Sequence, residues 1–188
     1  MSSVVNRKLT VVQVLPALQS GGVERGTLEV GKYLVEQGHR SIVISDNGRL
    51  VNQLIEEGSE HIHWPIGRKS LLTLRFIPHL IAFLKDNEVD VLHVRSRFPA
   101  WICYLAWKIM PVSKRPHLIT TVHGTYSISP YSAIMTKGEQ VIVISKMIRD
   151  YVLKNYRVNP DKLHLNYRGV DEQSFPYAYQ PTKEWLEK

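Results

Sequence analysis

Short runs of β-branched and aliphatic residues alternate along this chain with stretches of helical periodicity, and no other feature limits the fold as strongly. The strand-like runs, such as residues 9–15 and 41–45, are almost continuously apolar. Strands of that kind are buried on both faces, which occurs when helices cover both sides of a parallel sheet. The sequence therefore predicts an α/β fold, a Rossmann-like doubly wound parallel sheet.

The same pattern gives the order of the expected elements. Strands are predicted at residues 9–15, 41–45, 61–66, 89–94, 118–122, 141–144 and 163–167. Helices are predicted at residues 23–37, 51–57, 71–85, 100–110 and 146–156. Pro78 is expected to kink or break the third helix, the fourth should begin just after Pro99, and Ser145 should cap the fifth.

Cysteine is too scarce for several classes of site. Cys103 is the only cysteine of the 188 residues, which excludes an internal disulfide, a zinc finger and an iron–sulfur centre. His61 and His63 share a strand face, but no third ligand accompanies them, and we expect no metal ion. A single cysteine fits a reducing compartment, so we expect a cytoplasmic location, with peripheral contact at the inner membrane face as an option.

No run of apolar residues is long enough to cross a membrane. The longest candidate, residues 98–112, is shorter than the ~18 residues that a span needs, and it contains Lys108. The apolar residues near the N-terminus loosely resemble a signal peptide, but Gln13 interrupts them and no cleavage site of small residues follows. We expect neither a membrane span nor a signal peptide.

The net charge of +7 is concentrated in one part of the chain. Residues 67–115 contain nine basic and three acidic side chains, a net charge of +6. Such a surface attracts nucleic acid, anionic lipid or phosphorylated substrates, or it is a solvated basic face. Because no RNP motif or zinc-finger spacing accompanies the charge, nucleic acid is disfavoured as a partner.

Glycines stand in the loop that follows the first predicted strand. Residues 19–26 read Gln-Ser-Gly-Gly-Val-Glu-Arg-Gly, just before a helix. Glycines allow close approach of a backbone and the helix N-terminus offers free N–H groups, so an anion such as phosphate is the expected ligand; a tight turn with positive φ is the alternative. The spacing is neither a Walker A loop nor Gly-x-Gly-x-x-Gly. Asp46 stands where a dinucleotide-binding fold places its ribose-binding acid, so a dehydrogenase-like NAD site is a second interpretation.

Basic side chains and a histidine follow two other predicted strands. In an open α/β sheet, ligands bind beyond the carboxyl ends of the strands. Arg95 and Arg97 follow the fourth strand and suit a clamp on phosphate or carboxylate, unless they are solvated or paired with acids. His123 follows the fifth strand, and it either points into the ligand cleft or is structural.

Taken together, these loops resemble the N-terminal domain of glycosyltransferase family 4, nucleotide-sugar-dependent enzymes of the GT-B fold. The resemblance covers nearly the whole chain in the order of the family. Single pieces are weak, but six of them in order are specific. The matching pieces are residues 15–26, 36–39, 93–101, 120–126, 143–145 and 168–171, with Phe175.

The resemblance implies a function and a set of site residues. Enzymes of this family bind a nucleotide sugar between two Rossmann-like domains and transfer the sugar with retention at the anomeric carbon, with no metal or other cofactor expected. Gly21 and Gly22 would approach the donor diphosphate, and His123 would face the transferred sugar. Basic side chains would contact the acceptor or phosphate, the candidates being Arg25, Arg95 and Arg97. The basic segment fits an anionic glycan or glycolipid acceptor, such as lipopolysaccharide or another cell-envelope saccharide, at an anionic membrane surface.

The family's C-terminal domain, with its Glu-x7-Glu motif and most of the nucleotide pocket, is not in this sequence. We therefore expect residues 1–174 to form the acceptor-side domain and residues 175–188 to be a linker toward a nucleotide-sugar-binding domain supplied in cis or in trans. The chain alone should fold but not turn over. Two other interpretations remain: an interaction module that completes a separate catalytic subunit, and the dehydrogenase-like domain suggested by Asp46.

Overall fold

The computed structural model describes residues 7–169 and Tyr177, and the rest of the predicted 175–188 linker lies outside them, as do Asp171 and Phe175 of the matching pieces. The described residues form one seven-stranded sheet in which all neighbouring strands are parallel, in the order β3-β2-β1-β4-β5-β6-β7. The predicted Rossmann-like α/β sheet is confirmed. The strands are β1 (Thr10–Ala17), β2 (Arg40–Asp46), β3 (Glu60–His63), β4 (Val91–Val94), β5 (His117–Val122), β6 (Gln140–Val143) and β7 (Leu163–Leu165).

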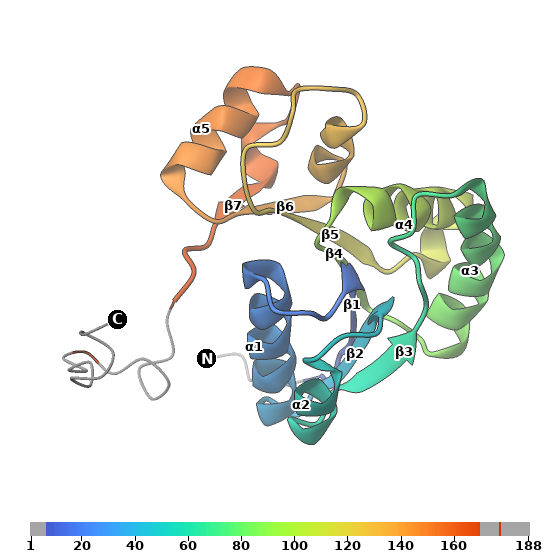
Figure 1. The fold of residues 1–188 in the computed structure, drawn as a ribbon. Helices are drawn as coiled ribbons and strands as arrows, with labels where there is room; N and C mark the ends of the chain where they lie inside the picture. The colour runs from blue at the N-terminus through green and yellow to red at the C-terminus, as the bar shows by residue number, and fades with distance from the viewer. Residues whose placement is uncertain (1–6, 170–176, 178–188) are drawn as a thin grey trace, which may run out of the picture.

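Helices cover the sheet from two sides, with α1 and α2 on one side and α3 and α4 on the other (Figure 1). Successive crossovers run from β1 toward one edge and from β4 toward the other, so the direction reverses between these two central strands. Ligands of such folds bind at this reversal point. The helices are α1 (Gly22–Glu36), α2 (Val51–Glu56), α3 (Phe76–Asp86), α4 (Arg97–Ile109) and α5 (Lys146–Asn155), with short 3-10 turns η1 (Leu71–Arg75), η2 (Val112–Lys114), η3 (Ser132–Thr136) and η4 (Pro160–Lys162).

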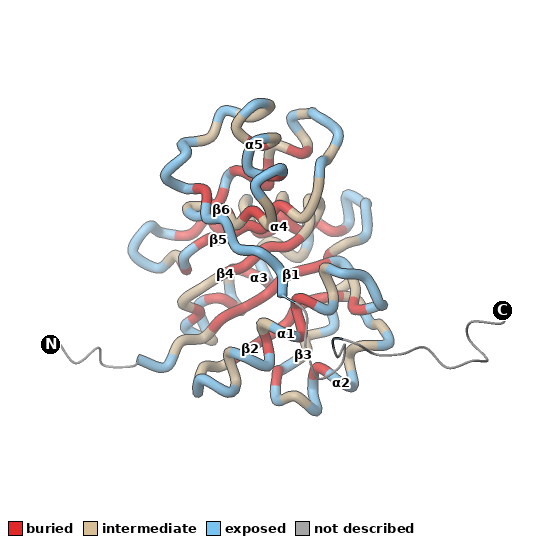
Figure 2. The backbone as a smooth tube through the Cα atoms, turned by 90° about the vertical axis from the view of Figure 1, so that its left-hand side faces the viewer, coloured by how far each residue is buried: buried red, intermediate tan, exposed pale blue. Residues whose placement is uncertain are grey.

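The alternation of side chains along each strand produces two hydrophobic cores. Val12 and Val14 of β1 pack into the larger core, whereas Leu15 packs with Val43 and Leu28 into a smaller core beneath α1. Figure 2 shows the buried residues, in red, running through the middle of the molecule along the strands. Gln13 is a buried polar residue within this apolar strand.

Two helix boundaries differ from the prediction because proline is tolerated in the first turn of a helix, where its missing N–H has no intrahelical partner. The predicted helix at 71–85 begins as η1, and α3 starts at Phe76, so the break precedes Pro78. Helix α4 starts at Arg97 rather than just after Pro99. The predicted cap is confirmed, since Ser145 Oγ accepts a hydrogen bond from the Ile148 amide at 3.2 Å.

Candidate functional site

A cleft of about 150 Å³ opens beside the reversal point of the sheet, on the side of α1. Its walls come from α1, from the ends of β4, β5 and β6, and from the segment that follows β7. Four residues of basic type line it, with Glu29 of α1 as the acidic neighbour: His93, Arg95, His123 and Arg168. Segments far apart in the sequence therefore supply one polar site.

Arg95 is fixed at the floor of this cleft. Its amide donates to the carbonyl of Val14 at 3.0 Å, and its Nη1 donates to Oε1 of Gln13 at 2.8 Å. Only 5% of the residue is exposed, and its Nε has no partner among the described residues. Burial lowers the pKa of Arg95 to about 10, with repulsion from Arg168 adding to the effect and Glu29 opposing it. At neutral pH the guanidinium is still a cation, so the cleft holds a buried positive charge.

His123 follows β5 and lines the same cleft. Both of its ring nitrogens are buried, and neither has a hydrogen-bond partner within the described residues. Burial, together with the positive charges of Arg95 and Arg168, lowers the pKa of His123 to about 3. The imidazole is therefore neutral at pH 7, with one nitrogen able to donate and the other able to accept a hydrogen bond. Buried polar groups normally have partners, so these two nitrogens indicate a place for a ligand.

Arg168 closes the cleft from the segment after β7. Its Nη2 lies 3.9 Å from Oε2 of Glu29. The guanidinium rests on two glycines of α1: a Cβ on Gly26 would stand 2.2 Å from Nη2, and one on Gly22 would stand 3.0 Å from Nη1. The absence of side chains at these positions allows the guanidinium to lie against the start of the helix.

Four of the predicted site residues lie in or beside the cleft. The structure places Arg95 and His123 in the cleft and Gly22 against Arg168 at its edge, with Gly21 next to it as the N-cap of α1.

The tight-turn alternative for the glycine loop is wrong, because Gly21 has a φ of −81° and Gly38 and Gly58 are the glycines with positive φ in the described part of the chain.

Two predicted arginines lie outside the cleft. Arg25 is an exposed residue of α1. Arg97 donates to Ser132 Oγ at 3.2 Å, and its guanidinium lies 4.7 Å and 5.5 Å from the ring centroids of Tyr126 and Tyr131. Arg97 therefore joins the start of α4 to the loop around η3, and its predicted contact with acceptor or phosphate is not supported by its place in the structure.

Two polar residues at or beneath the cleft were not predicted as site residues from the sequence. Gln13 links Arg95 to α1, because its Nε2 donates to the carbonyl of Thr27 at 3.0 Å. His93 lies on β4, two residues before Arg95, with its Nε2 at 2.7 Å from Thr121 Oγ1. Burial holds the pKa of His93 well below its usual range. A glutamine inside an apolar buried strand was the available signal for the first of these, since such a residue needs a buried partner.

The carboxylate of Asp46, the candidate ribose-binding acid, forms hydrogen bonds with other groups of the protein. Its Oδ1 lies 2.8 Å from His63 Nε2 and accepts from the Asn47 amide at 2.9 Å, while its Oδ2 accepts from Arg68 Nη2 at 3.2 Å. These contacts, led by the one from His63, lower the pKa of Asp46. With both oxygens engaged, the arrangement disfavours the dehydrogenase-like interpretation.

Neither a metal cluster nor a membrane span is found in the part of the chain that the structure describes. Across residues 7–169, no three His, Cys, Asp or Glu side chains gather closely enough to hold an ion. His61 instead lies 3.0 Å from Ser45 Oγ through its Nε2. None of the described helices combines the length and the apolar character that crossing a bilayer requires.

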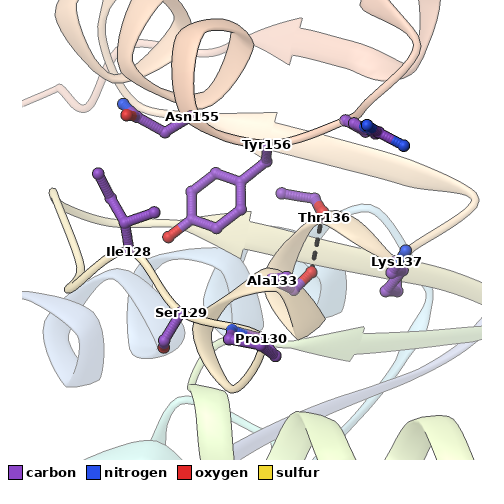
Figure 3. A pocket seen from close by; sticks show the side chains of 9 residues that line it. Ile128, Ser129, Pro130, Ala133, Thr136, Lys137, Asn155 and Tyr156 are labelled. Carbon is purple, nitrogen blue, oxygen red and sulfur yellow. Dashed lines mark hydrogen bonds between the residues drawn. The ribbon is translucent and has the colours of Figure 1, made fainter.

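A second cleft, of about 390 Å³, lies between the loop that precedes η3 and the end of α5 (Figure 3). Tyr156 occupies the middle of this view with its hydroxyl toward Ile128 and Ser129, and Thr136 Oγ1 donates to the Ala133 carbonyl at 2.8 Å. The cleft has no carboxylate, and none of the predicted site residues line it. It is larger than the first cleft, and its Tyr156 hydroxyl is also buried without a partner among the described residues. Of the two, the first cleft is the candidate site because it brings a buried guanidinium beside an unpartnered imidazole.

Comparison with known proteins places this chain in a family. No curated protein sequence matches the chain. A glycosyltransferase from Rickettsia africae is 40% identical, with a TM-score of 0.78 over 96% of this chain and 48% of that one. HepE from Anabaena, solved with UDP and glucose, is 13% identical, with a TM-score of 0.68 over 88% and 46% of the two chains. The lipopolysaccharide outer core galactosyltransferase WaaB is 11% identical, with a TM-score of 0.62 over 86% and 46%.

This chain spans about half the length of each of these structures. Its fold is that of one half of a GT-B glycosyltransferase, as the sequence predicted. The family model described as Glycosyltransferase Family 4 matches residues 20–174, which include the glycine loop, Arg95, His123 and Arg168. The chain therefore belongs to glycosyltransferase family 4.

Proposed function

We propose that this chain is the acceptor-side half of a retaining, nucleotide-sugar-dependent glycosyltransferase, and that its cleft binds the diphosphate and sugar of the donor. Residues 1–174 form that half, and residues 175–188 lead toward the domain that binds the nucleotide. The observation that carries the proposal is the pair of unpartnered nitrogens of His123, buried beside the guanidiniums of Arg95 and Arg168. The neutral imidazole can donate one hydrogen bond and accept another, and it lies next to two guanidinium cations. This combination suits a sugar hydroxyl beside a diphosphate anion.

The proposed reaction requires charge stabilisation more than proton transfer from the protein. The bond between the anomeric carbon and the diphosphate oxygen breaks, and the acceptor hydroxyl oxygen bonds to that carbon on the same face. In the chain without ligand the pKa of His123 is about 3, so we assign His123 no role as a base, and in the proposal the departing diphosphate receives the hydroxyl proton. Arg95 and Arg168 stabilise the negative charge that develops on the leaving group.

The remaining residues have supporting roles in this proposal. The backbone N–H groups at Gly21 and Gly22 face the diphosphate at the N-terminus of α1, where the helix dipole favours an anion. His123 positions a hydroxyl of the transferred sugar through one ring nitrogen. Arg25 is an exposed candidate for the acceptor side. No metal or other cofactor takes part.

The acceptor proposed is an anionic glycan or glycolipid of the cell envelope, lipopolysaccharide included, modified by a cytoplasmic enzyme at the inner membrane face. The net charge of +6 in residues 67–115 and the printed name of one structural neighbour, a lipopolysaccharide galactosyltransferase, support this choice. An interaction module that completes a separate catalytic subunit is the competing interpretation. Co-purification of the chain with a second Rossmann-like protein would favour it.

Titration of the chain with UDP, GDP and inorganic pyrophosphate, followed by the NMR signals of its histidine rings, tests the proposal. Binding of an anion beside Arg95 and Arg168 offsets their repulsion, so the pKa of His123 should rise. Arg168→Gln should weaken pyrophosphate binding by about tenfold, whereas Arg149→Gln, on the exposed face of α5, should not change it. An anion that binds without moving the His123 signals would place the donor elsewhere and reject the proposed site.

A further inference from the structure

Three leucines of η1 point into solvent. Leu71 is 86% exposed, Leu72 is 73% exposed and Leu74 is 44% exposed. They lie within five consecutive residues, so their side chains form one apolar patch rather than scattered contacts. Contiguous exposed apolar side chains on a folded domain commonly mark a surface that another body covers.

The turn that carries these leucines is held in place by hydrogen bonds of Ser70 and Thr73. Ser70 Oγ accepts from the Leu72 amide at 3.2 Å and caps η1. Thr73 is only 3% exposed, and its hydroxyl donates to the carbonyl of Arg68 at 2.6 Å. Because Thr73 occupies the inward position, the leucines on either side of it cannot turn into the core. Their exposure is therefore a fixed property of the fold.

The patch lies at the end of the sheet where the strands have their carboxyl ends, as the cleft does. Gly67 is packed so closely on the last residues of β1 that a Cβ there would stand 2.6 Å from the Cα of Pro16. Arg68 reaches Asp46, the last residue of β2, with its Nη2 at 3.2 Å from Oδ2. Both contacts are made at the carboxyl ends of strands, where the glycine loop and Arg95 are also found.

Cations and no carboxylates surround the leucines in the sequence. Between Glu60 and Asp86 the chain has no acidic residue. Lys69 and Arg75 flank η1, and neither pairs with a carboxylate of the described residues. A groove of about 260 Å³ beside the turn is lined by Arg68, Ser70, Leu72, Thr73, Arg75 and Phe76. Guanidinium groups and a hydroxyl next to exposed leucines are suited to a lipid phosphate above its acyl chains.

We propose that η1 docks the chain on an anionic lipid bilayer. Leu71, Leu72 and Leu74 enter the boundary between headgroups and acyl chains, while Lys69 and Arg75 contact lipid phosphates. A partner protein or a second copy of the chain would need a carboxylate-rich surface to match these cations, whereas an anionic bilayer supplies both the negative charge and the apolar layer. The docking does not depend on the proposed transferase activity, but it would bring the cleft edge to a membrane that carries a glycolipid acceptor.

Sedimentation of the chain with lipid vesicles tests this proposal. Vesicles of phosphatidylcholine containing about 30 mol% phosphatidylglycerol should bind the chain, and pure phosphatidylcholine should bind it at least about tenfold less. Leu71→Ser/Leu72→Ser should reduce binding to the anionic vesicles by more than about tenfold. Lys69→Gln/Arg75→Gln should do the same at low salt, and raising the salt should weaken binding of the unchanged chain. These side chains are exposed, so the variants keep the fold.

A matched control is available at the other end of the sheet, between the end of α4 and the start of β5. Ile109 and Val112 are 65% and 78% exposed and also have lysine neighbours, so Ile109→Ser/Val112→Ser should leave vesicle binding unchanged. A polarity-sensitive dye on Leu71→Cys should shift to the blue with anionic vesicles. Equal binding by the Leu71→Ser/Leu72→Ser chain would overturn the proposal. A dimer in the absence of lipid that this variant dissociates would also overturn it, in favour of a protein interface. Anion titration of the cleft without lipid is unaffected by either result.

Discussion

Arg95 and Gln13 join the two central strands of the sheet, through a bond of 2.8 Å from Arg95 Nη1 to Gln13 Oε1. Gln13 then donates to the carbonyl of Thr27, so the contact extends from β4 through β1 into α1. A buried cation is thereby oriented by a neutral side chain, and no carboxylate among the described residues forms an ion pair with it, so its charge is available to a ligand.

Replacing Gln13 with Leu should destabilise the protein, because Arg95 would keep its buried charge and lose its acceptor. We expect the free energy of unfolding to fall by about 2–4 kcal/mol in urea denaturation. Gln53→Leu serves as the control, since that exposed glutamine bonds only Glu57 on α2, and it should change stability by less than about 0.5 kcal/mol. Equal effects of the two variants would contradict a special role for Gln13.

Replacing Gly26 with Ala should displace Arg168, whose Nη2 would lie 2.2 Å from the new Cβ. The side chain is flexible at that end and alanine favours helix, so thermal stability should change little. Affinity for pyrophosphate should fall by about fivefold or more. In a chain that already carries Arg168→Gln, the same glycine substitution should have a much smaller effect on affinity, due only to Arg95, whose Nη2 would lie 3.1 Å from the new Cβ. Additive losses would show that Gly26 acts by another route.

The stability of the chain should depend on the protonation of His123. The folded-state pKa of about 3 lies below the ordinary 6.5, so between these values the unfolded state binds a proton that the folded state does not. The contribution of His123 to the free energy of unfolding is therefore complete above pH 6.5. It is lost as the pH falls toward 3, by up to about 1.4 kcal/mol per pH unit. His123→Gln should flatten this dependence in urea denaturation. Buried His93 contributes in the same direction, so part of the slope should remain.

His123→Ala should lower turnover in a two-domain enzyme, such as this chain joined to the C-terminal half of the Rickettsia africae glycosyltransferase. The loss of a hydrogen bond to the transferred sugar should reduce kcat by about a hundredfold. Circular dichroism should show an unchanged fold. Unaltered turnover would remove His123 from the reacting site, and robust transfer by the isolated chain would contradict the need for a second domain.

Cys103 should be unreactive in the folded protein. Its side chain is fully buried in α4, and burial raises the pKa of the thiol far above its usual range, so almost no thiolate is present. A thiol reagent should label the native chain only at the rate of unfolding and label the urea-denatured chain at once. Rapid native labelling would show that α4 opens. If Cys103 does not react in the folded protein, a thiol-reactive dye will label the Leu71→Cys variant at position 71 only.

The order of strands and helices follows from local pattern, and the sequence predicted it well. Apolar runs such as residues 41–45 identify buried strands because burial on both faces leaves no room for polar alternation. Boundaries were less accurate at Pro78 and Pro99, since proline was taken as a break, whereas it occupies the first turns of α3 and α4. The turn η3 was missed because its residues have no helical periodicity long enough to detect.

The candidate site was predicted in part. Arg95 and His123 were found because each follows a strand that ends at the ligand edge. Arg97 was included by the same argument, yet it is two residues further along the chain and belongs to α4, where it stacks on Tyr126 and Tyr131. Arg168 was in a matching piece but had no assigned role, because its contact with the glycines of α1 is set by tertiary packing over a long sequence separation.

The sheet ends on both sides in a very short strand. β3 has four residues and β7 has three, and β3 carries Glu60, which forms an ion pair with Arg40. Edge strands offer unpaired N–H and C=O groups that can recruit a strand from another molecule, and long apolar edges lead to aggregation. Edges this short give another chain little to join. The described sheet therefore gives this chain little tendency to polymerise through strand pairing, and its contacts with other molecules are left to the loops at the ends of the strands.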